Sequence, residues 1–209
     1  MTDKIKFLID YFSRTMPEPQ SELRYVNEYQ LVVAVVLSAQ CTDKRVNIIT
    51  PPLFEKLPDF VSLASASVEE VYALIKSCTY PNNKSKNLVK LAQVVCNEYN
   101  GSLPQTRDEL EKLPGIGRKT ANVVAAIAFK ENRFAVDTHV FRVANRLGIV
   151  KAKNPLETEK QLMKLFPPEV IPDAHHWLLL HGRYCCTARN PKCKECGISD
   201  ICKSFKNKS

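Results

Sequence analysis

The sequence predicts an all-α fold. Apolar residues recur at the 3.6-residue period of an amphipathic helix along most of the 209-residue chain. Helix-start signals accompany that period, the clearest being the capping box Thr106-Arg-Asp-Glu109. No set of alternating strands is found. The β-branched run at 32–36 leaves a buried strand open as the minor alternative, because it continues the helical period of its neighbours.

The first half of the chain contains four predicted helices. Residues 4–13 place their apolar side chains on one face, and residues 29–40 are apolar nearly all round, as expected in the centre of a core. Helical spacing returns in residues 68–76 and 87–99. The proline pairs at 51–52 and 167–168 are expected in loops.

The second half continues the helical pattern. The helix capped by Thr106 is predicted to end near Leu113, and the turn Pro114-Gly-Ile-Gly117 separates it from an apolar helix that runs to about Lys130. Three further helices are predicted, at residues 138–147, 155–165 and 174–182.

Composition excludes several classes of protein. The chain is 44% hydrophobic and 25% charged and is long enough to bury a core, so a mini-protein is excluded. The apolar runs 31–37 and 123–129 are too short to cross a bilayer. Charged residues interrupt the apolar ones in residues 1–12, unlike a secretory signal. We expect a soluble, cytoplasmic protein without a membrane partner.

Positive charge is clustered. Thirty Lys and Arg against 22 Asp and Glu give a formal net charge of +8. Residues 71–90 contain four lysines and no acid, and residues 183–209 contain seven basic residues and two acids. Such clusters favour a polyanionic partner, although a solvated, solubilising surface is the alternative for any single run.

The Pro114–Gly117 turn is a candidate anion site. Its two glycines allow strained backbone dihedrals and close approach to a ligand, and the helix that follows offers free N–H groups to a phosphate. A plain helix connection uses the same residue types. Arg118 and Lys119 favour the functional interpretation, because two cations at a helix N-terminus oppose its dipole unless an anion compensates.

Five of the eight cysteines lie between Cys185 and Cys202. In a reducing compartment such clustering indicates metal ligation in preference to disulfides. The spacing Cys186-x6-Cys193-x2-Cys196-x5-Cys202 can wrap one compact inorganic centre and leaves Cys185 as a spare thiol. Zinc is the alternative, but structural zinc sites usually have two Cys-x2-4-Cys pairs, and only one is present.

The segment Leu113-Pro-Gly-Ile-Gly-Arg-Lys-Thr-Ala121 resembles the helix-hairpin-helix motif of DNA glycosylases in the endonuclease III family. Leu37-Ser-Ala-Gln-Cys-Thr-Asp43, Ala135-Val-Asp-Thr-His-Val-Phe-Arg-Val143 and His181-Gly-Arg-Tyr184 occur in the family's order, so the resemblance covers nearly the whole chain. It implies a two-domain helix-hairpin-helix DNA glycosylase fold.

One expected domain is a helical barrel at residues 21–131, with the hairpin at about 106–130. The other joins residues 1–20 to 132–209 and holds the iron–sulfur loop 186–202, with DNA in the groove between the domains. The implied partner is double-stranded DNA containing damaged bases or abasic sites, bound by a monomer at the bacterial nucleoid.

The implied function is a bifunctional DNA glycosylase and AP lyase that excises oxidised pyrimidines and cleaves 3′ to the abasic site. Excision with strand cleavage requires an amine that forms a Schiff base with C1′. The resemblance assigns this amine to Lys119 and the assisting carboxylate to Asp137. From the residues alone, Lys119 as a phosphate contact and Asp137 as a helix N-cap stay open. Alternatives are a monofunctional glycosylase, such as the adenine glycosylases, and a non-catalytic DNA-binding module.

The resemblance also implies the remaining site residues. Gln40 enters the duplex, and Tyr80 stands at the position of a second, apolar wedge, with packing in the core as its alternative. The expected DNA contacts further include Lys84, Gly115, Gly117 and Arg118. A 4Fe–4S cluster is expected on Cys186, Cys193, Cys196 and Cys202, which lowers the net charge from +8 to about +6.

Overall fold

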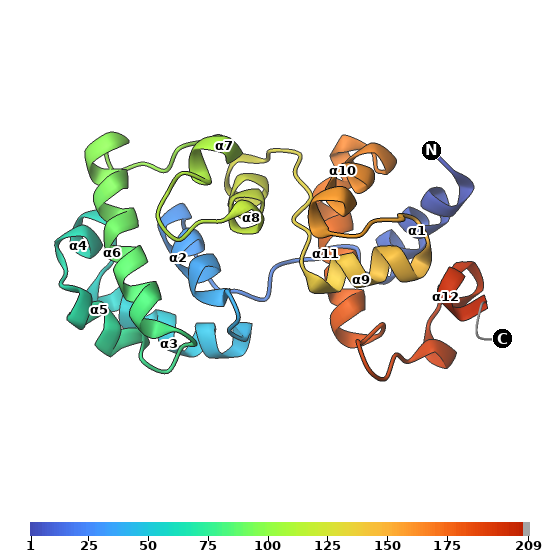
Figure 1. The fold of residues 1–209 in the computed structure, drawn as a ribbon, viewed down its shortest axis with the longest axis horizontal. Helices are drawn as coiled ribbons and strands as arrows, with labels where there is room; N and C mark the ends of the chain where they lie inside the picture. Colours follow the sequence, from blue (N-terminus) through green and yellow to red (C-terminus); the bar gives the residue numbers. More distant parts are fainter. Residues whose placement is uncertain (207–209) are drawn as a thin grey trace. The chain divides into compact units, whose positions relative to one another are not determined.

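The computed structural model describes residues 1–206, and every regular element among them is a helix (Figure 1). The all-α prediction is confirmed. Residues 32–36 lie inside a helix, α2, so the strand alternative is wrong. None of the described helices is both long and apolar enough to span a membrane.

The chain divides into two compact units. The inserted unit comprises Ser21–Glu131, and the split unit joins Met1–Gln20 to the chain from Asn132 onward. The inserted unit contains α2 (Glu28–Ser38), α3 (Asp43–Lys56), α4 (Phe60–Ser65), α5 (Val68–Ile75), α6 (Pro81–Glu98), α7 (Arg107–Leu110) and α8 (Arg118–Phe129). The split unit contains α1 (Asp3–Thr15), α9 (Thr138–Leu147), α10 (Pro155–Leu165), η1 (Pro168–Val170), α11 (Ile171–Tyr184), η2 (Cys193–Glu195), η3 (Ser199–Ile201) and α12 (Lys203–Lys206).

The core of the inserted unit surrounds α2. Every residue of this helix from Leu31 to Leu37 is buried, which explains why its sequence is apolar all round. The long helix α6 lies against α4 and α5, and α8 packs on α2 (Figure 1). The hydroxyl of Tyr29 donates to the carbonyl oxygen of Leu57 at 2.6 Å, so α2 is also fixed to the loop after α3.

The split unit has its own core, to which both ends of the chain contribute. The ring of Phe12 in α1 stacks on Trp177 in α11, with centroids 5.8 Å apart. The indole N–H of Trp177 donates to the carbonyl oxygen of Met16 at 2.9 Å. Gly182 allows α9 and α11 to pack closely, because a Cβ there would lie 2.9 Å from the Cβ of His139.

The proline pair at 51–52 was expected in a loop, and that expectation is wrong. Both prolines lie inside α3, which together with α4 is absent from the predicted helices. Val46, Ile49 and Leu53 bury one face of α3 at helical spacing, while the prolines are exposed. The backbone bonds that prolines remove therefore fall on the solvent side, where water satisfies the carbonyl groups.

Candidate functional site

The turn between α7 and α8 depends on Gly115. This glycine has a φ of +77°, and a Cβ there would lie 2.8 Å from the Cβ of Asn87 on α6. Gly117 differs, because its φ of −93° suits any residue and a Cβ there would point into open space. The expectation that both glycines relieve backbone strain is right for Gly115 and wrong for Gly117.

The first turn of α8 presents donors and an amine to the outside. Gly117 is the N-cap and supplies no side-chain acceptor, so backbone N–H groups stay available to an anion. Lys119 is exposed, and its ammonium makes no hydrogen bond or ion pair with residues 1–206. Arg118 beside it is half-buried and interacts with other groups of the protein.

Asp137 is the N-cap of α9, which confirms the structural alternative predicted for this residue. Its Oδ1 accepts from the backbone N–H groups of His139 and Val140, both at 2.8 Å. The half-buried side chain forms no further hydrogen bond with the described part of the chain. The cap therefore uses one carboxylate oxygen, fixes the orientation of the group and leaves Oδ2 for a ligand.

Gln40 and Tyr80 occupy two connected loops, both with left-handed backbone. Their φ values are 55° and 53°, a conformation that costs a non-glycine residue about 1 kcal/mol or more. The hydroxyl of Thr79 donates to the carbonyl oxygen of Gln40 at 2.7 Å, which joins the loops. Gln40 is exposed, and Tyr80 is 61% exposed, so the alternative of a core tyrosine is wrong.

Lys84 was expected on the DNA surface, but its side chain is only 6% exposed. Its ammonium donates to the carbonyl oxygens of Leu37 at 2.8 Å and Ala39 at 2.7 Å, at the C-terminal end of α2. A cation there satisfies helix-terminal carbonyls and suits the negative end of the dipole. The predicted role of Lys84 in DNA contact is therefore corrected. Its buried ammonium fixes the segment that leads to Gln40.

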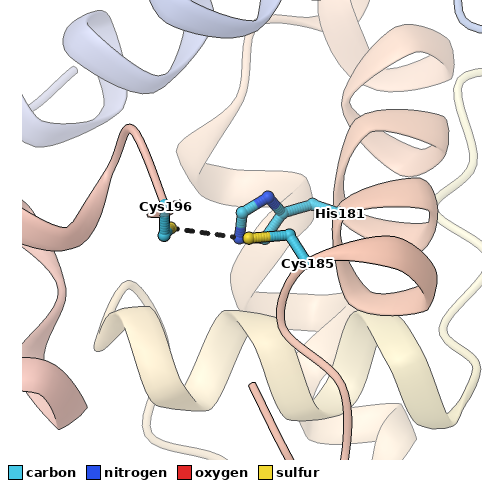
Figure 2. A group of neighbouring side chains, drawn as sticks. All are labelled: His181, Cys185 and Cys196. Carbon is cyan, nitrogen blue, oxygen red and sulfur yellow. Dashed lines mark hydrogen bonds between the residues drawn. The ribbon is translucent and has the colours of Figure 1, made fainter. Parts of the chain in front are cut away.

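The five clustered cysteines line one cavity. Its wall includes the thiols of Cys185, Cys186, Cys193, Cys196 and Cys202 and also Arg146, Leu147 and Phe205. Figure 2 shows His181 and Cys185, at the end of α11, facing Cys196 of the loop, with their ligand atoms within 4.8 Å of one another. Cys185, which was predicted to be a spare thiol, therefore lines the same cavity as the four predicted ligands.

Arg142 and Arg146 of α9 hold the start of this loop. Arg142 donates to the carbonyl oxygens of Gly182 at 2.7 Å and Cys186 at 3.1 Å. Arg146 donates to Thr187 O at 2.7 Å, and its guanidinium lies 3.5 Å from Cys186 Sγ. Four thiolates around a 4Fe–4S centre carry a charge of about −2, which a guanidinium compensates. Neither arginine was predicted to belong to the site. Their i, i+4 spacing, which places both on one face of a predicted helix, is the sequence feature that could have indicated it.

Burial makes one thiol of the cavity hard to ionise. It raises the pKa of Cys196 to about 12, so this group stays protonated at pH 7 unless a metal replaces the proton. Burial lowers the pKa of His181 to about 4, so its imidazole is neutral at pH 7. Its Nε2 lies 3.8 Å from Cys196 Sγ.

Two family models match the chain. Residues 33–168 match the HhH-GPD superfamily of base excision DNA repair proteins. Residues 186–202 match the iron-sulfur binding domain of endonuclease III, a segment that begins at Cys186, ends at Cys202 and leaves out His181 and Cys185. The chain belongs to the endonuclease III family. The predicted 4Fe–4S cofactor is confirmed, and the zinc alternative is wrong.

Similar proteins span almost the full chain. Endonuclease III of Bacillus subtilis (strain 168) is 45% identical over 201 residues, covering 96% of this chain and 92% of that protein. Endonuclease III of Escherichia coli (strain K12) is 44% identical over 186 residues, or 89% and 88% of the two chains. A solved trapped endonuclease III–DNA covalent intermediate is 42% identical with a TM-score of 0.93, covering 100% and 99% of the two chains.

A more distant structure, a thermostable thymine-DNA glycosylase, is 26% identical with a TM-score of 0.87 and covers 98% of this chain and 97% of that one. The predicted fold and family are therefore confirmed. The buried position of Lys84 was not predicted. A lysine in a segment otherwise rich in exposed cations gives no local sign of burial.

Proposed function

We propose that this chain is a bifunctional DNA glycosylase and AP lyase of base excision repair that removes oxidised pyrimidines from double-stranded DNA. The observation that carries the proposal is the amine of Lys119, which stands in the first turn of α8 behind a glycine hairpin and without a partner among residues 1–206. The covalent complex named for the related solved structure supports chemistry of this kind.

Lys119 acts as the nucleophile. Its nitrogen lone pair forms a bond to C1′, and the bond between C1′ and the base breaks, with the electron pair leaving on the base. Opening of the sugar ring gives a Schiff base. Loss of a proton from C2′ then expels the 3′ phosphate by β-elimination, and water releases the amine. An amine is required because it alone among side-chain nucleophiles forms the Schiff base from which the elimination proceeds.

Asp137 supplies a fixed negative charge to the same reaction. Because its Oδ1 is bound by two backbone N–H groups, the carboxylate does not need to reorient when charge develops. Oδ2 accepts a proton from the attacking amine or stabilises positive charge at C1′. The N-cap and catalytic interpretations of Asp137 are thus compatible.

The other site residues bind and distort the DNA. The N–H groups behind Gly115 and Gly117, with Arg118, receive a backbone phosphate. Gln40 and Tyr80 fill the space left by the flipped nucleotide, and their strained backbones hold both side chains outward. Cys186, Cys193, Cys196 and Cys202 hold the 4Fe–4S cluster. When bound, the cluster cross-links the loop 186–202 and fixes its basic side chains.

Borohydride trapping on an abasic-site duplex tests the proposal. Reduction of the Schiff base leaves a covalent protein–DNA adduct that survives denaturing electrophoresis. Lys119→Gln should form no adduct while binding the duplex only modestly less tightly, because the hairpin N–H groups remain. Lys112→Gln removes an exposed lysine that lies between α7 and the Pro114–Gly117 turn, and this variant should trap like the unmodified protein.

Three results would contradict the proposal. Trapping by Lys119→Gln at the unmodified level would move the nucleophile to another amine. An unmodified protein that binds the duplex without nicking it would be a non-catalytic module, and one that excises bases without an adduct would be a monofunctional glycosylase.

We further propose that the protein acts as a monomer on DNA of the bacterial nucleoid. The bacterial source of its curated relatives and its net positive charge support this location.

A further inference from the structure

Two cysteines that the proposed function does not use lie in the loops that carry Gln40 and Tyr80, one in each loop. Cys41 follows Gln40 directly, and Cys78 stands two residues before Tyr80. Three helices separate the two cysteines in the sequence, but their loops meet beside them: Thr79, which follows Cys78, donates its hydroxyl to the carbonyl oxygen of Gln40, which precedes Cys41, at 2.7 Å. Neither belongs to the iron–sulfur segment 186–202.

The position of Cys78 is fixed by two hydrogen bonds. The residue is 4% exposed, and its thiol donates to the carbonyl oxygen of Leu37 at 3.4 Å. The Lys84 ammonium donates to the Cys78 sulfur at 3.2 Å. Burial raises the pKa of Cys78, so this group is a protonated thiol fixed in the loop beside Cys41.

Cys41 is half-buried and is the more reactive member of the pair. Burial alone would raise its pKa, but the polar groups around it, with Thr79 and the positive charge of Lys84 among them, outweigh burial and lower it. The thiolate fraction is therefore increased near neutral pH, and the thiolate is the reactive form. An accessible thiol of lowered pKa beside a second cysteine is the arrangement of a peroxide-sensitive site.

We propose that Cys41 and Cys78 form a modification site at which hydrogen peroxide converts the two thiols to a disulfide. The Cys41 thiolate attacks one peroxide oxygen, the O–O bond breaks, and the other oxygen leaves as hydroxide, which takes a proton to become water. Cys41 is then a sulfenic acid. The Cys78 sulfur attacks the Cys41 sulfur, the S–O bond breaks, and the hydroxyl leaves with the Cys78 proton as a second water. Two thiols are oxidised and one peroxide is reduced.

The disulfide would join the loops that carry Gln40 and Tyr80. Thr79 and Lys84 already connect these loops through hydrogen bonds that can break and reform. A covalent link removes that freedom, so we expect oxidation to slow excision from intact duplex about tenfold or more, since insertion tolerates little misplacement. This consequence rests on the proposed function, whereas formation of the disulfide does not.

Peptide mapping tests the site without reference to activity. Cluster-loaded protein is treated with a small excess of hydrogen peroxide, alkylated, digested and analysed by mass spectrometry. We expect a peptide pair linked through Cys41 and Cys78. Cys78→Ser should instead give a Cys41 sulfenic acid that dimedone labels, and Cys96→Ser, which changes a half-buried cysteine of α6, should give the linked pair as before.

Two mapping results would overturn the proposal. One is alkylation of both cysteines to the same extent with and without peroxide. The other is oxidation of Cys41 to the sulfinic acid while Cys78 stays a free thiol, since this would show that Cys78 does not resolve the intermediate.

Activity assays separate this proposal from the proposed function. The oxidised protein should excise a base from duplex DNA slowly, recover after treatment with dithiothreitol, and show no such change in the Cys41→Ser variant. A linked pair with unchanged excision would confirm the modification site and refute its effect on insertion. Failure of Lys119 trapping in reduced protein would refute the proposed function and leave the mapping result valid.

Discussion

Asp137 combines a structural and a chemical requirement in one side chain, and substitution can separate them. Asparagine caps a helix about as well as aspartate but lacks the charge. We expect Asp137→Asn to unfold at nearly the same temperature and to lose at least ~10²-fold in excision rate, the scale of an acid–base or electrostatic group. Thermal denaturation and single-turnover kinetics measure the two effects.

The matched control is Asp59→Asn. Asp59 caps α4 in the same way, accepting from the backbone N–H of Ser62 at 2.8 Å, but lies outside the proposed site. It should keep full activity. An active Asp137→Asn protein would reduce Asp137 to a cap.

Tyr80 is the one large aromatic side chain of the Gln40–Tyr80 loops, and its exposure is costly unless DNA covers it. We expect Tyr80→Ala to slow excision from intact duplex more than cleavage at an existing abasic site, because the latter needs less unstacking. Parallel assays on the two substrates measure the difference. Tyr72→Ala, which changes a partly exposed tyrosine of α5, should affect neither. Equal losses on both substrates in Tyr80→Ala would rule out a wedge.

At the scale of elements, the hairpin offers a comparison between neighbouring glycines. Gly115→Ala forces a left-handed residue and a 2.8 Å approach to Asn87, whereas Gly117→Ala meets neither obstacle. We expect Gly115→Ala to lower the free energy of unfolding by about 1–3 kcal/mol and Gly117→Ala to change it little. Denaturant titration measures both. Equal destabilisation would mean that the hairpin backbone differs from the one described.

The C-terminal loop is an element whose order depends on its ligands. We expect Cys186→Ser to lose the brown colour, the broad absorption near roughly 400 nm and much of the thermal stability, since a structural metal contributes to folding free energy. Cys185→Ser should keep all three, although its thiol lies at the same cavity. Iron analysis provides the measurement. Loss of iron in Cys185→Ser would make Cys185 a ligand.

At the scale of the whole molecule, strongly periodic segments could be predicted and tertiary exceptions could not. The ranges 138–147 and 155–165 are confirmed as α9 and α10, because an N-cap marks the start of each one and α9 also buries an apolar stripe. Helix α3 was not predicted because a pair of prolines normally ends a helix. That both prolines lie on the solvent-exposed face of α3 is known only from the structure. The inward turn of Lys84 and the left-handed backbones of Gln40 and Tyr80 depend on contacts between distant segments, which local patterns do not encode.

The division of the chain also sets an order of events during synthesis. Domains fold as units while the ribosome is still adding residues. The inserted unit is continuous from Ser21 to Glu131, so all of its core is available once that stretch has emerged. Helix α1 is made before the inserted unit, yet Phe12 must wait for Trp177, which follows only after that unit is complete. Helix α1 therefore leaves the ribosome before the inserted unit but is buried after it, and its apolar face is the part of these helices that a chaperone would protect longest.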